Sequence, residues 1–203
     1  MIELHNISKK FNEKVVLDKF SLEVKKNEFV TIIGKSGSGK TTILNILGLL
    51  EKADSGSIKI NNYTNPNKKQ VQQLRRYNLG YIFQNYALLE DENVKNNLIL
   101  ATKFSNTFDK SYLIKVLKDV GLTEDILDKK VYKLSGGEQQ RLAIARILLK
   151  PCNIILADEP TGNLDDYNKK IIIDLLRNLN KTIICVTHDD YVAKNSDRVI
   201  SLD

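Results

Sequence analysis

The stretch Gly34-Lys35-Ser36-Gly37-Ser38-Gly39-Lys40-Thr41 is the most informative part of the sequence. It matches the pattern G-x-x-x-x-G-K-[ST], follows the apolar run of residues 29–33 and precedes residues 41–50, whose apolar side chains recur at helix spacing. Glycines let the backbone curl until successive N–H groups converge on phosphate oxygens, and the start of the following helix adds partial positive charge. The stretch therefore predicts a strand, a phosphate-binding loop and a helix, in that order.

The loop and the helix start supply the predicted contacts to a nucleoside triphosphate. We expect Lys40 to reach the β and γ phosphates and the Thr41 hydroxyl to bind Mg²⁺. A flexible glycine turn with one lysine is the alternative, but the flanking strand and helix favour the phosphate loop. The predicted nucleotide-binding residues of this region are Gly34, Lys35, Ser36, Gly37, Ser38, Gly39, Lys40, Thr41 and Thr42.

Three further short apolar runs resemble the run before the glycine loop. They occupy residues 81–83, 154–157 and 182–187 and are apolar without alternation, which is typical of strands buried on both faces of a parallel sheet. Segments with helical spacing at residues 138–149 and 168–180 separate them. Strand and helix therefore alternate, and we predict an α/β fold around a mostly parallel sheet.

Other segments depart from this pattern. Residues 2–8, 20–24 and 57–61 alternate apolar with polar side chains, which indicates antiparallel strands with one wet face and hence a small antiparallel β subdomain near the N-terminus. Residues 98–130 are mostly helical in pattern. We expect them to belong to an inserted helical subdomain of about residues 85–150, within a single domain of residues 1–203.

Each buried run ends in residues that are out of place in a core. These are Gly34, Gln84, the pair Asp158 and Glu159, and the pair His188 and Asp189. The ligand crevice of an open parallel sheet lies outside the carboxyl ends of its strands. We therefore expect four strands to point at one site.

The adjacent carboxylates Asp158 and Glu159 are the strongest catalytic candidates. Two ionised carboxylates at the end of a buried strand are costly without a cation or another partner. We predict that Asp158 holds Mg²⁺ through water and that Glu159 polarises the water that attacks the γ-phosphate. The alternative is that the pair only caps the segment that starts at Pro160.

Residues 135–138 have the sequence of a capping box, S-x-x-E, at the start of a helix. A capping box explains Ser135 and Glu138 but not Gly136 and Gly137, because glycine costs helix stability unless the backbone must approach something closely. We therefore interpret this helix start as a second phosphate-binding element.

The sequence LSGGEQQR at residues 134–141 resembles the signature of ATP-binding cassette (ABC) ATPases, a family with a P-loop NTPase core. The resemblance extends over essentially the whole chain. In that family the phosphate loop of one subunit and the signature of another enclose the nucleotide. The resemblance thus implies a second copy as a head-to-tail partner, ATP and Mg²⁺ as cofactors, and nucleotide contacts from Ser135, Gly136, Gly137 and Glu138.

The resemblance also assigns roles to single residues that, on their own, are ordinary. Gln84 resembles the glutamine that senses Mg²⁺ and the transmembrane partner, and residues 85–97 after it would form part of a groove for that partner. His188 resembles the switch histidine that contacts the γ-phosphate. Phe11 stands in place of an aromatic residue, usually tyrosine, that stacks on adenine, and residues 163–165 resemble the D-loop. The implied metal ligands are Thr41, Gln84 and Asp158, and the implied catalytic residues are Glu159 and His188.

Composition restricts the remaining possibilities. The chain has 31 Lys and Arg against 25 Asp and Glu, a net charge of +6 that suits contact with phosphates, nucleic acid or an anionic membrane surface, although paired lysines are typical of a solvated surface. The longest apolar run, residues 43–50, is far shorter than the roughly 18 residues that span a bilayer. The N-terminus lacks the pattern of a secretory signal, so we expect a cytoplasmic location. Cys152 and Cys185 are expected to be buried thiols.

We therefore expect the ATP-hydrolysing subunit of a transporter, held at the inner face of the cell membrane by separate permease subunits. Residues 43–55 and 158–165 are similar to the exporter-type subfamily of lipoprotein-release, macrolide or peptide efflux and bacteriocin-export systems. The alternative is a cassette ATPase of a non-transport assembly such as a cell-division complex. A third possibility, an ATPase acting on nucleic acid, is disfavoured because 203 residues hold neither a second cassette nor long coiled-coil arms.

Overall fold

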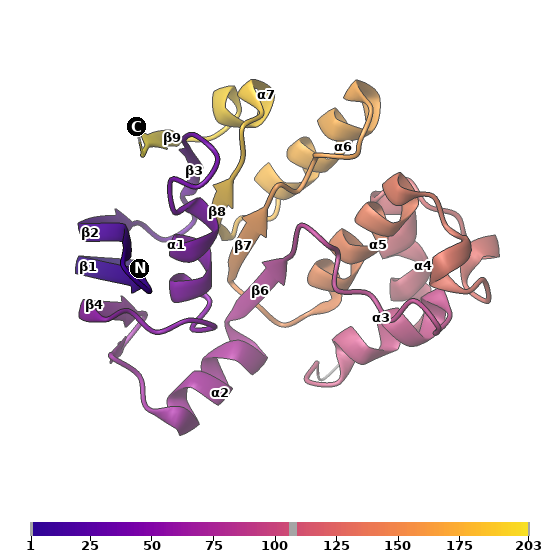
Figure 1. Cartoon of the computed structure of the whole chain (residues 1–203). Helices are drawn as coiled ribbons and strands as arrows, with labels where there is room; N and C mark the ends of the chain where they lie inside the picture. Colours follow the sequence, from indigo (N-terminus) through magenta and orange to yellow (C-terminus); the bar gives the residue numbers. More distant parts are fainter. Residues whose placement is uncertain (1, 106–108, 203) are drawn as a thin grey trace.

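The computed structural model describes residues 2–105 and 109–202, which form two sheets (Figure 1). The parallel sheet consists of β3 (Phe29–Ile33), β6 (Leu79–Ile82), β7 (Ile154–Asp158), β8 (Thr182–Val186) and β9 (Arg198–Ser201), in the order β6-β7-β8-β3-β9. The antiparallel sheet consists of β1 (Ile2–Phe11), β2 (Lys14–Val24), β4 (Ser55–Ile60) and β5 (Tyr63–Thr64), in the order β2-β1-β4-β5. The predicted combination of a parallel core and a separate antiparallel sheet is confirmed.

The helix after the glycine loop, α1 (Lys40–Leu47), lies between the two sheets (Figure 1). Its buried residues Ile43, Leu44, Ile46 and Leu47 share one apolar cluster with Ile2 of β1 and Ile32 of β3. This packing ties the loop firmly to both sheets, because burying each such side chain stabilises the fold by about 2 kcal/mol.

The other helices cover the opposite face of the parallel sheet or its margin. They are α2 (Lys68–Tyr77), α3 (Val94–Thr102), α4 (Lys110–Asp119), α5 (Gly136–Leu149), α6 (Asp166–Arg177) and α7 (Asp190–Lys194), with short 3₁₀ turns at Glu124–Ile126 and Val131–Lys133. Ile155 and Ile183 pack against the cluster formed by α3 to α7, whereas Leu156 and Ile184 pack on the α1 side. Both faces of the central strands are therefore buried, as their continuous apolar runs predict.

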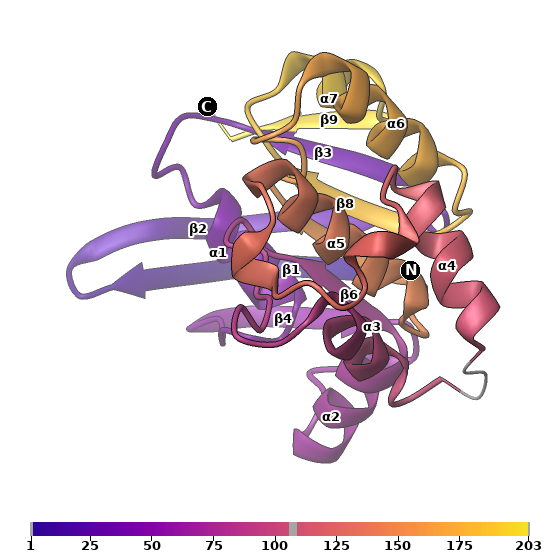
Figure 2. The same cartoon turned by 90° about the vertical axis from the view of Figure 1, so that its right-hand side faces the viewer.

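The arrangement separates the β1–β2 hairpin from the helical part. Figure 2 shows the hairpin extending on one side of the molecule and α3 and α4 lying on the other. Among the described residues, no helix combines the length and the hydrophobicity needed to cross a membrane. Cys152 and Cys185 are buried free thiols, as predicted.

Several predicted boundaries were wrong, for identifiable reasons. Strands β1 and β2 are longer than expected because bulges after Leu4 and Ile7 interrupt the alternation on which the prediction rested. Strand β6 begins at Leu79 and ends before Phe83. Helix α2 was not anticipated, since Leu74 is its only buried residue among mostly polar and basic ones. The helical segment starts at Val94, where Asn93 caps α3, and its residues 106–108 lie outside the described residues.

Candidate nucleotide-binding and catalytic site

The strand order brings the predicted strand-end residues to one edge of the parallel sheet. Ile32 of β3 pairs with Val186 of β8, and Val186 lies between Ile32 and Asp158 of β7. Three adjacent strands therefore end at the same level. At these ends lie the glycine loop, the pair Asp158 and Glu159, and the pair Thr187 and His188. Gln84 follows β6, the neighbour of β7, and is exposed two residues beyond the strand end.

The glycine loop has the backbone shape that phosphate binding requires. Gly37 and Gly39 have φ values of 80° and 96°, in the region that only glycine adopts without strain. A Cβ at Gly39 would also come within 3.0 Å of Val16 Cγ1, so the loop lies directly against β2. Gly39 precedes α1 and has no side chain that could cap the helix. The first N–H groups of α1 therefore face the loop without a capping side chain as partner. This is the geometry of an anion-binding helix start.

The polar groups of the loop also suit a phosphate. Lys40 Nζ donates to Gly34 O at 2.6 Å and Lys35 O at 2.9 Å, which places the ammonium group inside the loop. Within the described part of the chain, the Ser38 hydroxyl is buried without a hydrogen-bond partner. A phosphate oxygen would satisfy both groups. Ser36 lies exposed at the loop tip, and Thr42 lies partly buried in α1.

Thr41 and Asp158 lie beside this loop and form a set of oxygen ligands. The Thr41 side chain is hydrogen-bonded to Asp158, a residue that is only 6% exposed. Burial raises the pKa of Asp158, the adjacent Glu159 raises it further, and Thr41 and Lys40 partly oppose the shift. A divalent cation would relieve this cost, and a hydroxyl and a carboxylate are ligands that Mg²⁺ prefers. The residues present therefore fit the predicted metal.

Glu159 is held in place from several directions. Its φ of 48° lies in the left-handed region, and its N–H donates to Val186 O at 2.9 Å. Its carboxylate accepts from the Thr187 hydroxyl at 2.7 Å through Oε2, and Oε1 lies 2.8 Å from Nδ1 of His188. The two predicted catalytic residues are therefore in direct contact. Thr187 was not among the predicted site residues, although its place at the end of a buried strand was a signal.

The signature residues begin helix α5. Ser135 Oγ accepts from Glu138 N at 3.3 Å, and Glu138 Oε2 accepts from Ser135 N at 2.8 Å, so the predicted capping box is present. The hydrogen bond from Ser135 N lowers the pKa of Glu138 despite partial burial. Ser135 and Gly136 are exposed, and α5 packs on the face of the sheet opposite α1. The exposed start of α5 and the glycine loop therefore lead into helices on opposite faces of the sheet.

A second missed residue, Gln140, joins α5 to the catalytic segment. Its side chain is 2% exposed. Nε2 donates to Pro160 O and to Glu159 O, the latter at 3.4 Å, and Oε1 accepts from Asn163 N at 3.2 Å. A polar residue inside an otherwise apolar helix face was the available signal.

Phe11 ends β1 at the hairpin and is 46% exposed. Lys9 Nζ lies 5.1 Å from its ring centroid, and Lys9 itself is fixed by Glu51 at 2.6 Å. The hairpin borders the loop through Val16 and Leu17, which contact the position of a Gly39 Cβ. The Phe11 ring is therefore exposed on the hairpin that borders the loop.

Comparison with known proteins places this site in a family. The sequence model of the ABC transporter family matches residues 17–162. The macrolide export ATP-binding/permease protein MacB of Campylobacter jejuni is 42% identical to the chain over 210 residues, which cover 100% of this chain and 33% of that protein. The chain thus spans about a third of the length of that relative. The lipoprotein-releasing system ATP-binding protein LolD of Bacteroides thetaiotaomicron is 37% identical, with 100% of this chain and 96% of that protein covered.

Solved structures agree with the sequence relatives. The dimeric structure of the bacterial ABC transporter cassette MJ0796 has a TM-score of 0.91 at 37% identity, covering 99% of this chain and 94% of that chain. A post-hydrolysis structure of the same cassette, bound to ADP and Pi, also has a TM-score of 0.91. With the glycine loop, the paired carboxylates and the signature helix in place, these findings show that the chain belongs to the ABC transporter family as an ATP-hydrolysing cassette.

Proposed function

We propose that the chain drives an exporter for a peptide, lipoprotein or hydrophobic compound, with two copies enclosing ATP head to tail and acting on separate permease subunits at the inner membrane face. One observation carries this proposal. The helices that follow the glycine loop and Ser135, α1 and α5, pack on opposite faces of the parallel sheet. A second copy in the opposite orientation would bring its signature to the glycine loop of the first copy. Both elements would then contact one nucleotide.

Different residues of the chain bind the nucleotide, hold the metal and activate the water. Lys40 exchanges the carbonyls of Gly34 and Lys35 for phosphate oxygens, and Phe11 stacks on the base. Thr41, Asp158 and Gln84 would hold Mg²⁺, which would supply positive charge against the phosphates. Glu159 accepts the proton of the attacking water, and His188 leaves Glu159 to contact the γ-phosphate.

A large groove supports the proposed permease contact. It has a volume of about 1210 Å³ and lies between the end of α1, α2, β6 and the ends of α3 and α5. Its apolar lining includes Leu49, Leu50, Phe83, Leu100 and Phe104. Phe83 places one wall next to Gln84. The lining includes none of residues 85–97, and their expected part in a groove for the permease stays a prediction.

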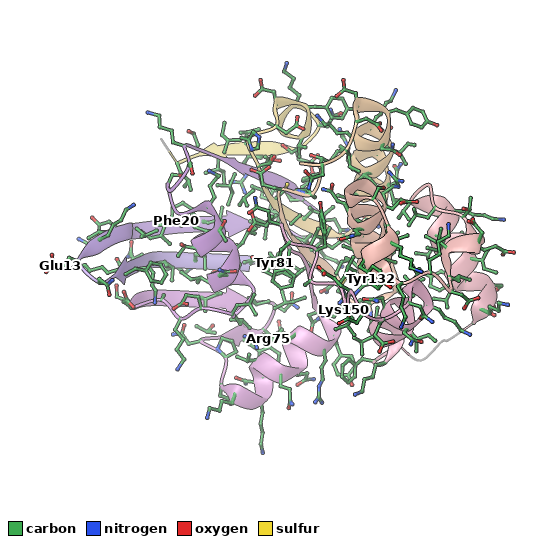
Figure 3. The ribbon with its side chains drawn as sticks, turned by 45° about the vertical axis from the view of Figure 1, so that its right-hand side comes forward. Glu13, Phe20, Arg75, Tyr81, Tyr132 and Lys150 are labelled. Atoms are coloured by element: carbon green, nitrogen blue, oxygen red, sulfur yellow. The ribbon has the colours of Figure 1, made fainter. Side chains whose placement is uncertain are left out.

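The charge of the groove indicates the chemistry of its occupant. Seven cationic residues line it, namely Lys52, Lys68, Lys69, Arg75, Arg76, Arg146 and Lys150. Figure 3 labels Arg75, Tyr81 and Lys150 of this lining. Among the described lining residues only Glu51 is acidic, and Lys9 neutralises it at 2.6 Å. A short permease helix with an apolar face and acidic side chains matches this surface.

The proposed dimer is tested with E159Q. Removal of the base leaves the phosphate contacts intact, so E159Q should bind ATP with wild-type affinity and accumulate as a dimer in size-exclusion chromatography with light scattering. K40A is the matched control, because it removes the phosphate contact and should stay monomeric. A wild-type rate of hydrolysis by E159Q would refute the role of Glu159, and a monomeric ATP-bound E159Q would refute the dimer.

The permease contact is tested with the charge reversal K68E/K69E. Both lysines are exposed at the start of α2, where acidic side chains are favourable to the helix. The variant should hydrolyse ATP at the basal rate but lose co-purification with the membrane subunits. K25E/K26E changes the same charge in an exposed turn away from the groove. Equal retention of both variants by the membrane subunits would contradict the docking site.

A further inference from the structure

Thr187 occupies a position at which three parts of the site meet. It follows the last residue of β8 and is 0% exposed. Its N–H donates to Ile32 O at 3.3 Å, on the strand that leads into the glycine loop. Its hydroxyl oxygen accepts from Asp189 N at 3.0 Å, in the turn that carries His188. Because Asp189 N approaches that oxygen as a donor, the hydroxyl proton is left to point at Glu159 Oε2, 2.7 Å away.

The two partners of the Glu159 carboxylate differ in their freedom to move. The His188 side chain is 80% exposed, so it can turn away from Glu159 without disturbing the core. Thr187 cannot do so, because its side chain is buried and its hydroxyl is engaged on both sides. A β-branched side chain also has few χ1 rotamers. Thr187 is thus the partner that stays with Glu159 when His188 leaves.

The backbone of Glu159 is fixed as well. Its N–H is bound to Val186 O and its carbonyl to Gln140 Nε2. The remaining freedom of the residue lies in its side-chain torsions, and the buried Thr187 hydroxyl restrains them by holding the carboxylate.

We infer that Thr187 is a positioning residue for ATP hydrolysis. Its hydroxyl holds Oε2 of Glu159 so that Oε1, released by His188, faces the attacking water in one orientation. The inference rests on the proposed role of Glu159 as the base, and it gives Thr187 a role through that carboxylate instead of through the nucleotide or the metal.

The test compares T187V with T187S in single-turnover hydrolysis of ATP by the full chain. T187V removes the hydroxyl at nearly constant shape and should lower the rate about tenfold, since small misplacements of a reacting group have effects of this size or larger. The KM for ATP should change less than about twofold, because substrate contacts are intact. T187S keeps the hydroxyl and should recover most of the rate. T31V is the matched control, since Thr31 is equally buried but its hydroxyl has no partner among the described residues.

A double variant separates positioning from a general structural effect. If Thr187 acts through the Glu159 carboxylate, adding T187V to E159Q should not slow the residual hydrolysis further. A wild-type rate for T187V, or an equal tenfold loss in the E159Q background, would overturn the inference. Circular dichroism checks folding, and T187A replaces T187V if the latter is unfolded. If E159Q alone retains the wild-type rate, it is the proposed role of Glu159 that fails.

Discussion

Replacing Gln140 with leucine removes one buried amide from the junction between α5 and the catalytic segment. Leucine has a similar volume, so the change leaves no large cavity, but Pro160 O and Asn163 N lose their side-chain partner and Glu159 O keeps only Gly162 N. Pro160 is buried and its carbonyl cannot reach water, which costs about 2 kcal/mol. Asn163 is exposed and Glu159 is partly exposed, so water can replace those bonds at a cost of about 1 kcal/mol together. The free energy of unfolding should therefore fall by about 3 kcal/mol.

Urea denaturation followed by circular dichroism measures this loss. Q73L is the matched control, because Gln73 is exposed in α2 and its replacement should change stability by less than about 0.5 kcal/mol. Hydrolysis by Q140L should also slow while ATP binding persists, because Gln140 holds the Glu159 carbonyl and not the phosphate loop. A loss of stability below about 1 kcal/mol would refute the reasoning, since it would mean that the Pro160 carbonyl finds another donor.

Three further predictions concern single side chains. T31V should raise the free energy of unfolding by about 1 kcal/mol, because the Thr31 hydroxyl is buried without a partner, and a lower melting temperature would contradict this. D158N should melt at a higher temperature than the wild type, because burial raises the pKa of Asp158 and makes its charge costly. The variant should lose Mg²⁺-dependent hydrolysis. Unchanged hydrolysis would exclude Asp158 as a metal ligand. Burial raises the pKa of Glu28, but hydrogen bonds from Arg198 and Lys25 N outweigh it and hold the pKa below 4.5. A lowered carboxyl pKa stabilises the fold above the unfolded-state value and loses that effect as the pH falls through the folded value. R198Q should therefore be less stable than the wild type at pH 7. Urea titrations should show that the difference in the free energy of unfolding shrinks below about pH 4.5. A difference that does not change with pH would rule out the ion pair as its cause.

Local patterns in the sequence were enough to predict the framework of this protein. The glycine loop between an apolar run and a helix, and the uninterrupted apolar residues of β7 and β8, predicted an α/β fold with its site at the strand ends. These features succeed because burial on both faces and phosphate binding impose their residue types on consecutive positions. Helix α2 escaped notice because little of it is buried, and the bulges of β1 concealed its length.

The order of the strands in space was not contained in any local pattern. That order sets β8 between β3 and β7, which brings Thr187 against Glu159, and it lays α5 over the same segment, which brings Gln140 against Pro160. The cationic groove likewise gathers residues from α2 and from the end of α5, far apart in the chain. The type of a residue indicates whether it tends to be buried or charged. Which residue it contacts depends on the packing of the whole chain. The sequence therefore determined which chemistry this protein carries, and the tertiary structure decided which side chains hold that chemistry in place.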